Sequence, residues 1–199
     1  MGWYDWFANI YDSSLEELYR DARSASASAL DLGGAARVLD LPTGTGQSLD
    51  SLVGGLPDAG RVLGADLSSG MLAKARKRVA KHGWAERVTL LEADVHSIEV
   101  APVDRLHVFL GLTAFPRYEE AFEHLWTLLE PGGRAVVVDV YAEKPGLQGK
   151  MVNLVAGADI TRRAWEPLER LCEGFSRTEL PANAKYGGAL WLATGTKPA

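Results

Sequence analysis

The sequence contains a single cysteine, no long apolar run and no excess of positive charge. Cys172 cannot form an intrachain disulfide, so we expect a reducing, cytoplasmic location. No N-terminal signal pattern is present, and no apolar run reaches the roughly 18 residues of a membrane span, so no transmembrane segment is predicted. The formal net charge of −5 argues against a nucleic-acid substrate, because phosphate binding depends on clustered Lys and Arg.

One segment is rich in basic residues although the chain as a whole is acidic. Lys74–Arg78 and Lys81 follow one another closely, but Leu72, Ala75 and Val79 recur between them at helical spacing. We interpret the run as the solvated side of an amphipathic helix and not as a nucleic-acid contact.

The most informative segment is VLDLPTGTG, Val38–Gly46, which joins a short apolar strand to a glycine turn. Gly44 and Gly46 have no Cβ, so the backbone can approach a ligand closely. A helix that follows the turn presents free N–H groups and its positive end to a polar ligand. The next strand, residues 61–66, ends at Asp66, an acid that can accept two hydrogen bonds from a ribose diol. The pattern predicts half of a nucleoside-binding site.

The glycine spacing distinguishes between two nucleoside cofactors. The dinucleotide fingerprint G-x-G-x-x-G requires a third glycine where Leu49 stands, which argues against NAD. The segment instead resembles the first motif of class I S-adenosylmethionine-dependent methyltransferases, D-x-G-x-G-x-G. Asp40, Gly44 and Gly46 match it, whereas Pro42 replaces the first glycine and removes one N–H donor. The resemblance implies S-adenosyl-L-methionine as cofactor, held in this loop by Asp40, Thr43, Gly44, Thr45 and Gly46.

The segment GADLSSGML, Gly64–Leu72, resembles the second motif of the same family. The resemblance implies that Asp66 holds the ribose hydroxyls and that Leu67 and Met71 pack against the adenine. Ordinary core packing is the alternative interpretation for Met71.

The segment LLEADVHSI, Leu90–Ile98, resembles the third motif. The resemblance implies that Asp94 accepts a hydrogen bond from the adenine amino group, while the N–H of Val95 reaches a ring nitrogen. A loop aspartate that caps a helix is the alternative.

A further apolar strand, Asp104–Leu110, ends where ligands bind in open α/β sheets, so Leu110 joins the predicted cofactor contacts. His107 lies within this strand, and we interpret it as a hydrogen-bonded core histidine. The passage LLEPGGRAVVVDVY, Leu128–Tyr141, then resembles the family's helix end, Pro-Gly-Gly turn and β-branched strand.

Helical patterns alternate with short strands from about residue 36 to 140, which predicts a parallel sheet covered on both faces in a single domain, residues 1–199. A helix near 162–173 and strands at 175–180 and 189–196 follow. The resemblance implies an α/β, Rossmann-like fold with seven strands, the last of them antiparallel. The core would span 36–196.

We expect residues 1–35 to form an N-terminal helical cap. A stripe of apolar side chains occupies one helical face there, namely Trp3, Trp6, Phe7 and Ile10. Packing over the sheet edge, a lid over the cofactor and a weak membrane-interface contact are the three interpretations. Two Tyr-Asp pairs, at residues 4–5 and 11–12, recur in small-molecule and lipid-type methyltransferases, so we favour a lid with packing and include Tyr11 among the cofactor contacts.

Residues 143–165 are expected to form a substrate-side insertion that includes a short apolar helix at 151–157. Together with the Tyr-Asp pairs, this arrangement resembles, more loosely, bacterial phospholipid and betaine-lipid N-methyltransferases. Arg162 or Arg163 would suit a phosphate or carboxylate on the acceptor, with a surface ion pair as the alternative.

The resulting hypothesis is an S-adenosylmethionine-dependent methyltransferase that acts on a small-molecule or lipid-like acceptor by in-line displacement. A general base is required only if the acceptor binds protonated. The candidates are Tyr11, His96, Asp139 and Tyr141; none is assigned as catalytic, and no metal site is predicted. The alternatives are a catalytically silent S-adenosylmethionine-binding module and an NAD-dependent oxidoreductase. The oligomeric state is left open.

Overall fold

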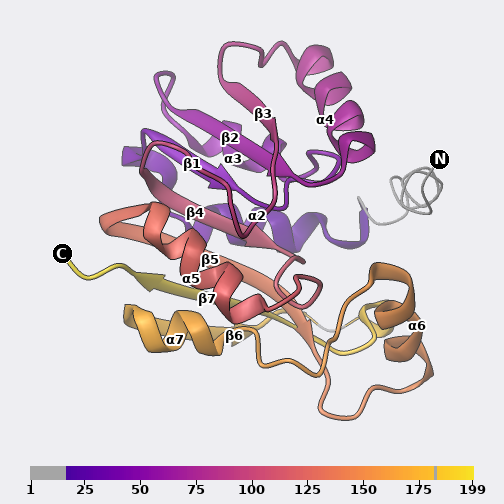
Figure 1. The fold of residues 1–199 in the computed structure, drawn as a ribbon. Helices are drawn as coiled ribbons and strands as arrows, with labels where there is room; N and C mark the ends of the chain where they lie inside the picture. The colour runs from indigo at the N-terminus through magenta and orange to yellow at the C-terminus, as the bar shows by residue number, and fades with distance from the viewer. Residues whose placement is uncertain (1–16, 182) are drawn as a thin grey trace.

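A seven-stranded sheet forms the centre of the molecule in the computed structural model, which describes residues 17–181 and 183–199 (Figure 1). The strand order is β3-β2-β1-β4-β5-β7-β6. The strands are β1 (Arg37–Asp40), β2 (Arg61–Asp66), β3 (Val88–Glu92), β4 (Val103–Phe109), β5 (Leu129–Tyr141), β6 (Glu173–Glu179) and β7 (Ala189–Thr196). β1 to β5 are parallel, whereas β7 runs antiparallel to both β5 and β6. The predicted α/β sheet with an antiparallel last strand is confirmed.

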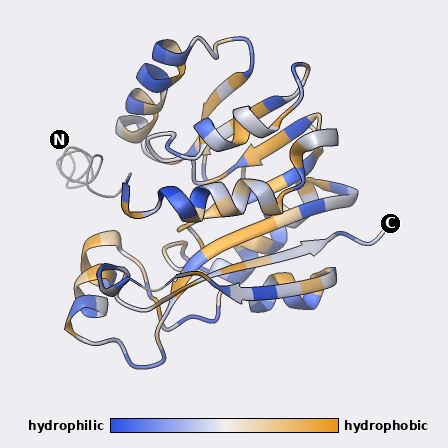
Figure 2. Ribbon diagram, turned by 180° about the vertical axis from the view of Figure 1, so that it is seen from behind, coloured by the Kyte–Doolittle hydropathy of each residue, from blue (hydrophilic) through white to orange (hydrophobic). Residues whose placement is uncertain are grey.

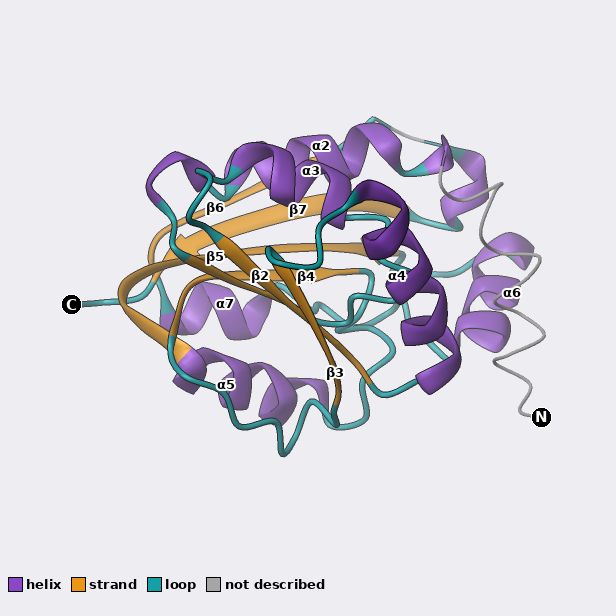
Figure 3. Cartoon of the chain, turned by 90° about the horizontal axis from the view of Figure 1, so that it is seen from above, coloured by secondary structure: helices purple, strands orange, loops and turns teal. Residues whose placement is uncertain are grey.

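Helices cover both faces of this sheet (Figure 3). On one face lie α2 (Arg20–Ala29), α3 (Leu49–Gly55) and α4 (Ser69–His82), and on the other α5 (Tyr118–Leu128) and α7 (Glu166–Leu171). Two short 3-10 turns, η1 (Leu32–Gly34) and η2 (Ala184–Tyr186), and the helix α6 (Leu147–Ala156) complete the described elements.

The central strands are apolar along nearly their whole length because helices bury them on both faces. Figure 2 shows this as a hydrophobic band through the middle of the sheet. Val136, Val137 and Val138 of β5 are each 0% exposed, and successive residues enter opposite cores. The sheet is therefore a rigid support for the loops at its ends.

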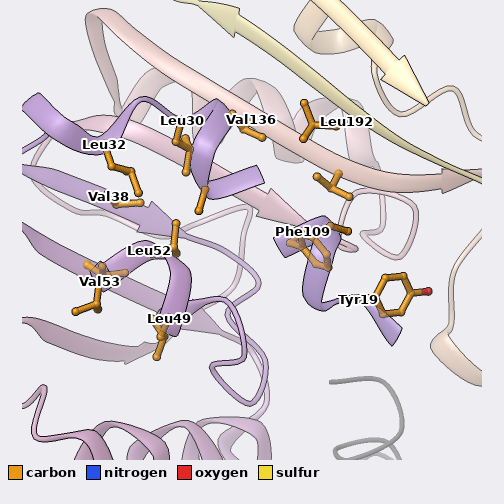
Figure 4. Packing of buried hydrophobic residues seen from close by; sticks show 14 of the residues in the cluster. Tyr19, Leu30, Leu32, Val38, Leu49, Leu52, Val53, Phe109, Val136 and Leu192 are labelled. Atoms are coloured by element: carbon orange, nitrogen blue, oxygen red, sulfur yellow. The ribbon is translucent and has the colours of Figure 1, made fainter. Parts of the chain in front are cut away.

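The helix α2 is packed onto the sheet by large apolar side chains (Figure 4). Leu30 is fully buried, and the Tyr19 ring lies edge-on to Phe109 of β4 with 6.1 Å between centroids. Tyr19 also stacks on Tyr186 of η2 at 4.8 Å. These contacts hold α2 against β5 and against the carboxyl end of β4.

The basic run is a solvated helix face, as predicted. Leu72, Ala75 and Val79 form the buried side of α4, and the Arg78 guanidinium pairs with Asp50 on α3 at 2.8 Å. The Ser68 hydroxyl caps the helix by accepting the Met71 N–H.

Several predicted boundaries are wrong. The helix expected at 162–173 is shorter, because α7 begins at Glu166 with a proline in its first turn and ends where Cys172 is extended. Residues 173–179 belong to β6, which starts two residues earlier than predicted. The helix expected at 151–157 is α6 and begins four residues earlier, at Leu147.

The Pro-Gly-Gly passage also differs from the expectation. β5 begins at Leu129, before the glycines, and its pairing with β4 shifts register before Arg134. Gly132 lies in the part of β5 where this register shift occurs, and its φ of 75° is a conformation that favours glycine. The Gly132 N–H donates to Lys197 O. The Tyr-Asp pairs and the tryptophan stripe lie outside the described residues.

Candidate functional site

A cavity of about 710 Å³ opens at the carboxyl ends of β1, β2, β3, β4 and β5. The chain leaves β1 toward β2 on one side and later places β4 on the other, so the cavity lies at the point where the strand order reverses. Open α/β sheets bind their ligands at such a point. The volume is within the ordinary range for small-molecule sites.

The glycine turn after β1 forms one wall. Thr43 N–H donates to Ala65 O at 2.8 Å, and Gly46 N–H returns to Thr43 O at 2.9 Å. Gly44 and Gly46 have φ of 56° and 80°. A Cβ on Gly46 would also lie 2.8 Å from Leu49 Cδ1, so this position requires glycine for both conformation and space.

Asp66 is fixed at the rim of the turn. Its Oδ2 accepts the Gly44 N–H at 2.8 Å, and its Oδ1 accepts the Ser68 N–H at 2.9 Å. Burial raises the pKa of the Asp66 carboxyl, and hydrogen bonds from the backbone N–H groups of Ser68, Gly44 and Leu67 oppose that rise. A carboxylate has about four acceptor sites, more than these backbone donors use, so the acid retains acceptor capacity toward the cavity.

Asp40 lies behind the cavity wall and not in its lining. It is 0% exposed, its Oδ1 is 2.7 Å from His107 Nδ1, and its Oδ2 accepts the Thr43 hydroxyl at 2.6 Å. His107 Nε2 lies 2.9 Å from the Ser26 hydroxyl of α2. His107 is thus the hydrogen-bonded core histidine that the sequence predicts. Asp40 positions the glycine turn through Thr43.

The opposite rim carries Asp94 and its neighbours. The Asp94 carboxylate accepts the His96 N–H at 2.8 Å and lies 3.0 Å from His96 Nδ1, which holds the pKa of Asp94 below its usual value. His96 Nε2 lies 2.9 Å from Pro116 O. His96 therefore ties the Asp94 loop to the loop after β4.

Arg23 and Gln47 are two of the polar cavity residues that were not predicted. Arg23 of α2 is 8% exposed, and its guanidinium donates to the Gln47 side-chain oxygen, just past the glycine turn. The same guanidinium lies over the Phe109 ring, 5.3 Å from its centroid. No local sequence pattern marks Arg23, because its place in the cavity arises from the packing of α2.

Asp139, near the end of β5, is a buried anchor for the loop after β4. Its Oδ2 accepts the Thr113 N–H at 3.0 Å, and its Oδ1 accepts the Thr113 hydroxyl at 2.7 Å and the Val140 N–H at 2.8 Å. Burial raises the pKa of Asp139 to about 6 despite these donors.

The remaining part of the cavity is apolar. This part is formed by Phe115 and Pro116 of the loop after β4, by Val152 and Val155 of α6 and by Ile160 of the loop after α6. The charged or titratable groups among the described lining residues lie outside this apolar group: Tyr19, Arg23, Asp66, Asp94, His96 and Asp139. The cavity thus combines a polar half near the glycine turn with an apolar half near α6.

The structure brings most predicted contacts together. Nine of them line the cavity: Thr43, Gly44, Thr45, Asp66, Leu67, Met71, Asp94, Val95 and Leu110. Asp40 and Gly46 are outside the lining, and Tyr11 lies outside the described residues. Of the base candidates, His96 and Asp139 line the cavity, whereas Tyr141 packs edge-on against Trp165 at 5.0 Å.

The two candidate acceptor arginines bind within the chain. Arg162 donates to Thr113 O and Phe115 O at 3.2 and 2.8 Å, and Arg163 pairs with Glu166 of α7. Neither arginine lines the cavity. Arg162 Nε also lies 3.5 Å from Asp159 Oδ2. Both arginines therefore agree with the ion-pair interpretation, and Arg162 in addition holds the loop after β4.

Comparison with known proteins finds similarity to methyltransferases. A family described as a methyltransferase domain matches residues 38–133. The chain is 29% identical over 189 residues to the ubiquinone/menaquinone biosynthesis C-methyltransferase UbiE of Azotobacter vinelandii, covering 81% of this chain and 74% of that protein. It is 38% identical over 105 residues to the demethylmenaquinone methyltransferase of Thermus thermophilus, covering 52% and 46%. The matches span about half the length of most curated relatives.

Solved structures share the fold at low sequence identity. A geranyl diphosphate methyltransferase aligns with a TM-score of 0.77 at 16% identity, covering 90% of this chain and 78% of that one. The N-methyltransferase NodS of Bradyrhizobium japonicum aligns with a TM-score of 0.74 at 15% identity, covering 96% and 91%.

Proposed function

We propose that this chain is an S-adenosylmethionine-dependent methyltransferase that transfers the cofactor's methyl group to a small, lipid-like acceptor. The match of residues 38–133 to a methyltransferase domain and the 29% identity to UbiE of Azotobacter vinelandii support the methyltransferase activity. The observation that carries the acceptor proposal is the division of the cavity into a polar and an apolar half. The polar half suits the cofactor. The apolar half along α6 suits a hydrocarbon part of the acceptor.

The residues present fit the cofactor. In this proposal Asp66 would accept the ribose hydroxyls, and Leu67 and Asp94, which line the same cavity, would contact the adenine. The glycine turn leaves open space at Gly44, where a Cβ would meet nothing within 4 Å. Arg23 supplies the cation that the carboxylate of the methionyl end would require.

Alignment is the principal task of this chain's own residues. The sulfonium of the cofactor supplies an electrophilic methyl group, and correct orientation of the acceptor removes about 7–11 kcal/mol of barrier in well-aligned systems. Both oxygens of Asp139 accept hydrogen bonds from Thr113, and the loop that Thr113 begins forms one side of the apolar half. In this proposal Asp139 and Thr113 hold in place the loop after β4 that would contact the acceptor.

The curated relatives support a lipid-like acceptor. UbiE of Azotobacter vinelandii is described as a C-methyltransferase of ubiquinone and menaquinone biosynthesis, and this chain matches 74% of its length. The looser resemblance to phospholipid N-methyltransferases proposes a headgroup nitrogen instead. Incubation with S-adenosylmethionine and a panel of quinol, prenyl and phospholipid acceptors distinguishes the two. A catalytically silent module would release no S-adenosylhomocysteine with any of them.

The cofactor assignment is tested by calorimetry on Asp66→Asn. The substitution keeps the shape of the side chain but removes the charge and one acceptor, so S-adenosylmethionine affinity should fall about tenfold or more. Asp58→Asn, in an exposed turn, is the control and should bind as wild type does. Equal affinity of the Asp66 variant and wild type would contradict the ribose role.

A further inference from the structure

The helix α6 carries apolar side chains both toward the cavity and on a neighbouring, exposed side. Val152 and Val155 line the cavity, and Gly149 is buried against the backbone of Gly187. On the outer side, Leu147, Met151 and Leu154 are 80%, 53% and 79% exposed. The spacing i, i+4, i+7 places these three on one stripe, which we call the α6 stripe. Three large apolar side chains on one exposed stripe mark an interaction surface.

The charges around the α6 stripe are mainly positive. Lys150 borders it on the helix, and Lys144 lies just before the helix. Lys185 is exposed on η2, which packs against α6. Glu143 is the one acid in the segment 143–157, although the whole chain has a net charge of −5. Within residues 143–157 the two lysines thus outnumber the one acid, which is the reverse of the balance in the whole chain.

We propose that the α6 stripe docks on an anionic lipid bilayer, with α6 lying in the plane of the interface. An amphipathic helix with apolar residues on one side and lysines beside them binds such a surface by partial burial and by attraction to anionic headgroups. Among the described helices none is long and apolar enough to cross a membrane, so this contact is peripheral.

The α6 stripe lies close to the cavity, so membrane docking there would be useful to the enzyme. The apolar half of the cavity lies directly on the inner side of the same helix. Figure 1 shows α6 at the outside of the molecule, away from the edge strand β3. Docking would bring the acceptor half of the cavity close to the bilayer, where a lipid-like acceptor is dissolved. This last step rests on the proposed function, whereas docking itself does not.

The test is flotation of the full chain with phosphatidylcholine vesicles, with and without phosphatidylglycerol. The wild type should float with the anionic vesicles and much less with the neutral ones. The double variant Leu147→Gln/Leu154→Gln should lose most of this binding, because it removes the apolar stripe and leaves the cavity lining unchanged. The control is Leu91→Gln on β3, which removes a leucine that is 36% exposed and distant from α6, and it should float as wild type does.

The charge contribution is tested separately with Lys144→Gln/Lys150→Gln. Binding to anionic vesicles should fall about fivefold for each lysine removed, and high salt should weaken wild-type binding in the same direction. Binding to neutral vesicles should be unaffected by these two substitutions.

Three outcomes would overturn the proposal. In the first, the wild type fails to bind anionic vesicles. In the second, the Leu147→Gln/Leu154→Gln variant floats as well as wild type, while Trp3→Ala/Trp6→Ala does not. In the third, light scattering shows a dimer that the Leu147→Gln/Leu154→Gln variant dissociates, which assigns the α6 stripe to a second copy of the chain. Flotation requires no turnover. Active enzyme without flotation therefore rejects the docking alone, and flotation of an inactive chain rejects the proposed function alone.

Discussion

Gly111, just after β4, provides the space in which the Pro42 ring lies. A Cβ on Gly111 would overlap Pro42 Cδ and would lie 2.9 Å from Pro42 Cγ. Pro42 stands where the family motif has its first glycine, and the Leu41–Pro42 peptide is cis. The larger side chain at position 42 is thus accommodated because Gly111, which faces it from the loop after β4, has no side chain.

This packing predicts a coupling between the two positions. Gly111→Ala should lower the free energy of unfolding by about 1–3 kcal/mol, as overpacking does. Adding Pro42→Gly should recover part of that loss, so the double variant is less destabilised than the sum of the singles. Urea unfolding measures all three, with Gly34→Ala as the control because a Cβ there meets nothing within 4 Å. Strict additivity would show that the ring is not the obstacle.

Arg23 predicts a ligand-selective loss of affinity. If the guanidinium pairs with the methionyl carboxylate, Arg23→Gln should weaken S-adenosylhomocysteine about 10–100-fold, the effect of one charge-assisted hydrogen bond. The affinity for 5′-methylthioadenosine, which has no carboxylate, should be unchanged. Calorimetry with both ligands measures the difference, and Arg20→Gln, exposed on the same helix, is the control. An equal loss for both ligands would indicate a general distortion of the cavity instead.

His96 predicts a change in the titration of Asp94. The His96 backbone N–H and imidazole both hold the pKa of Asp94 below its usual value. His96→Phe keeps a ring but removes the imidazole contribution, so the pKa of Asp94 should rise part of the way back. NMR titration of the carboxyl group measures it. His82→Phe on α4 is the control, and a pKa of Asp94 that does not respond to the His96 change would exclude the bond.

Asp139 predicts a pH-dependent stability difference. Burial raises its pKa from 3.8 to about 6, so the folded state disfavours the ionised carboxyl. Its contribution to stability is therefore largest below pH 3.8 and is lost as the pH rises through 6. The free energy of unfolding of wild type minus that of Asp139→Asn should fall by about 3 kcal/mol over this range. Denaturant unfolding at pH 4 and pH 7 measures it, and a constant difference would refute the shift.

The parts of the site that follow local rules were predictable from the sequence. Asp66, Asp94 and Leu110 stand at or just past strand ends, and a parallel sheet brings such positions to one edge. The glycine turn was predictable because Gly44 and Gly46 require positive φ.

The rest depends on contacts between distant parts of the chain. Arg23 reaches the cavity only because Tyr19 and Leu30 pack α2 onto the sheet. Asp40 carries the motif's acid, but its carboxylate turns away from the cavity because His107, 67 residues later, lies opposite in the register. The length of α7 was overestimated at both ends: residues 162–165 precede the helix, which begins with a proline in its first turn, and Glu173 pairs with β7.

The network of Asp40, His107 and Ser26 has a consequence for how this sequence can diverge. Each member of it is 0% exposed. Loss of His107 alone would leave a carboxylate in the core without its ring partner, and loss of Asp40 alone would leave an imidazole nitrogen without one. Replacing both by apolar residues of similar volume avoids either penalty. Relatives that depart from this pattern are therefore expected to have changed β1 and β4 together, as a linked pair of substitutions and not as two independent ones.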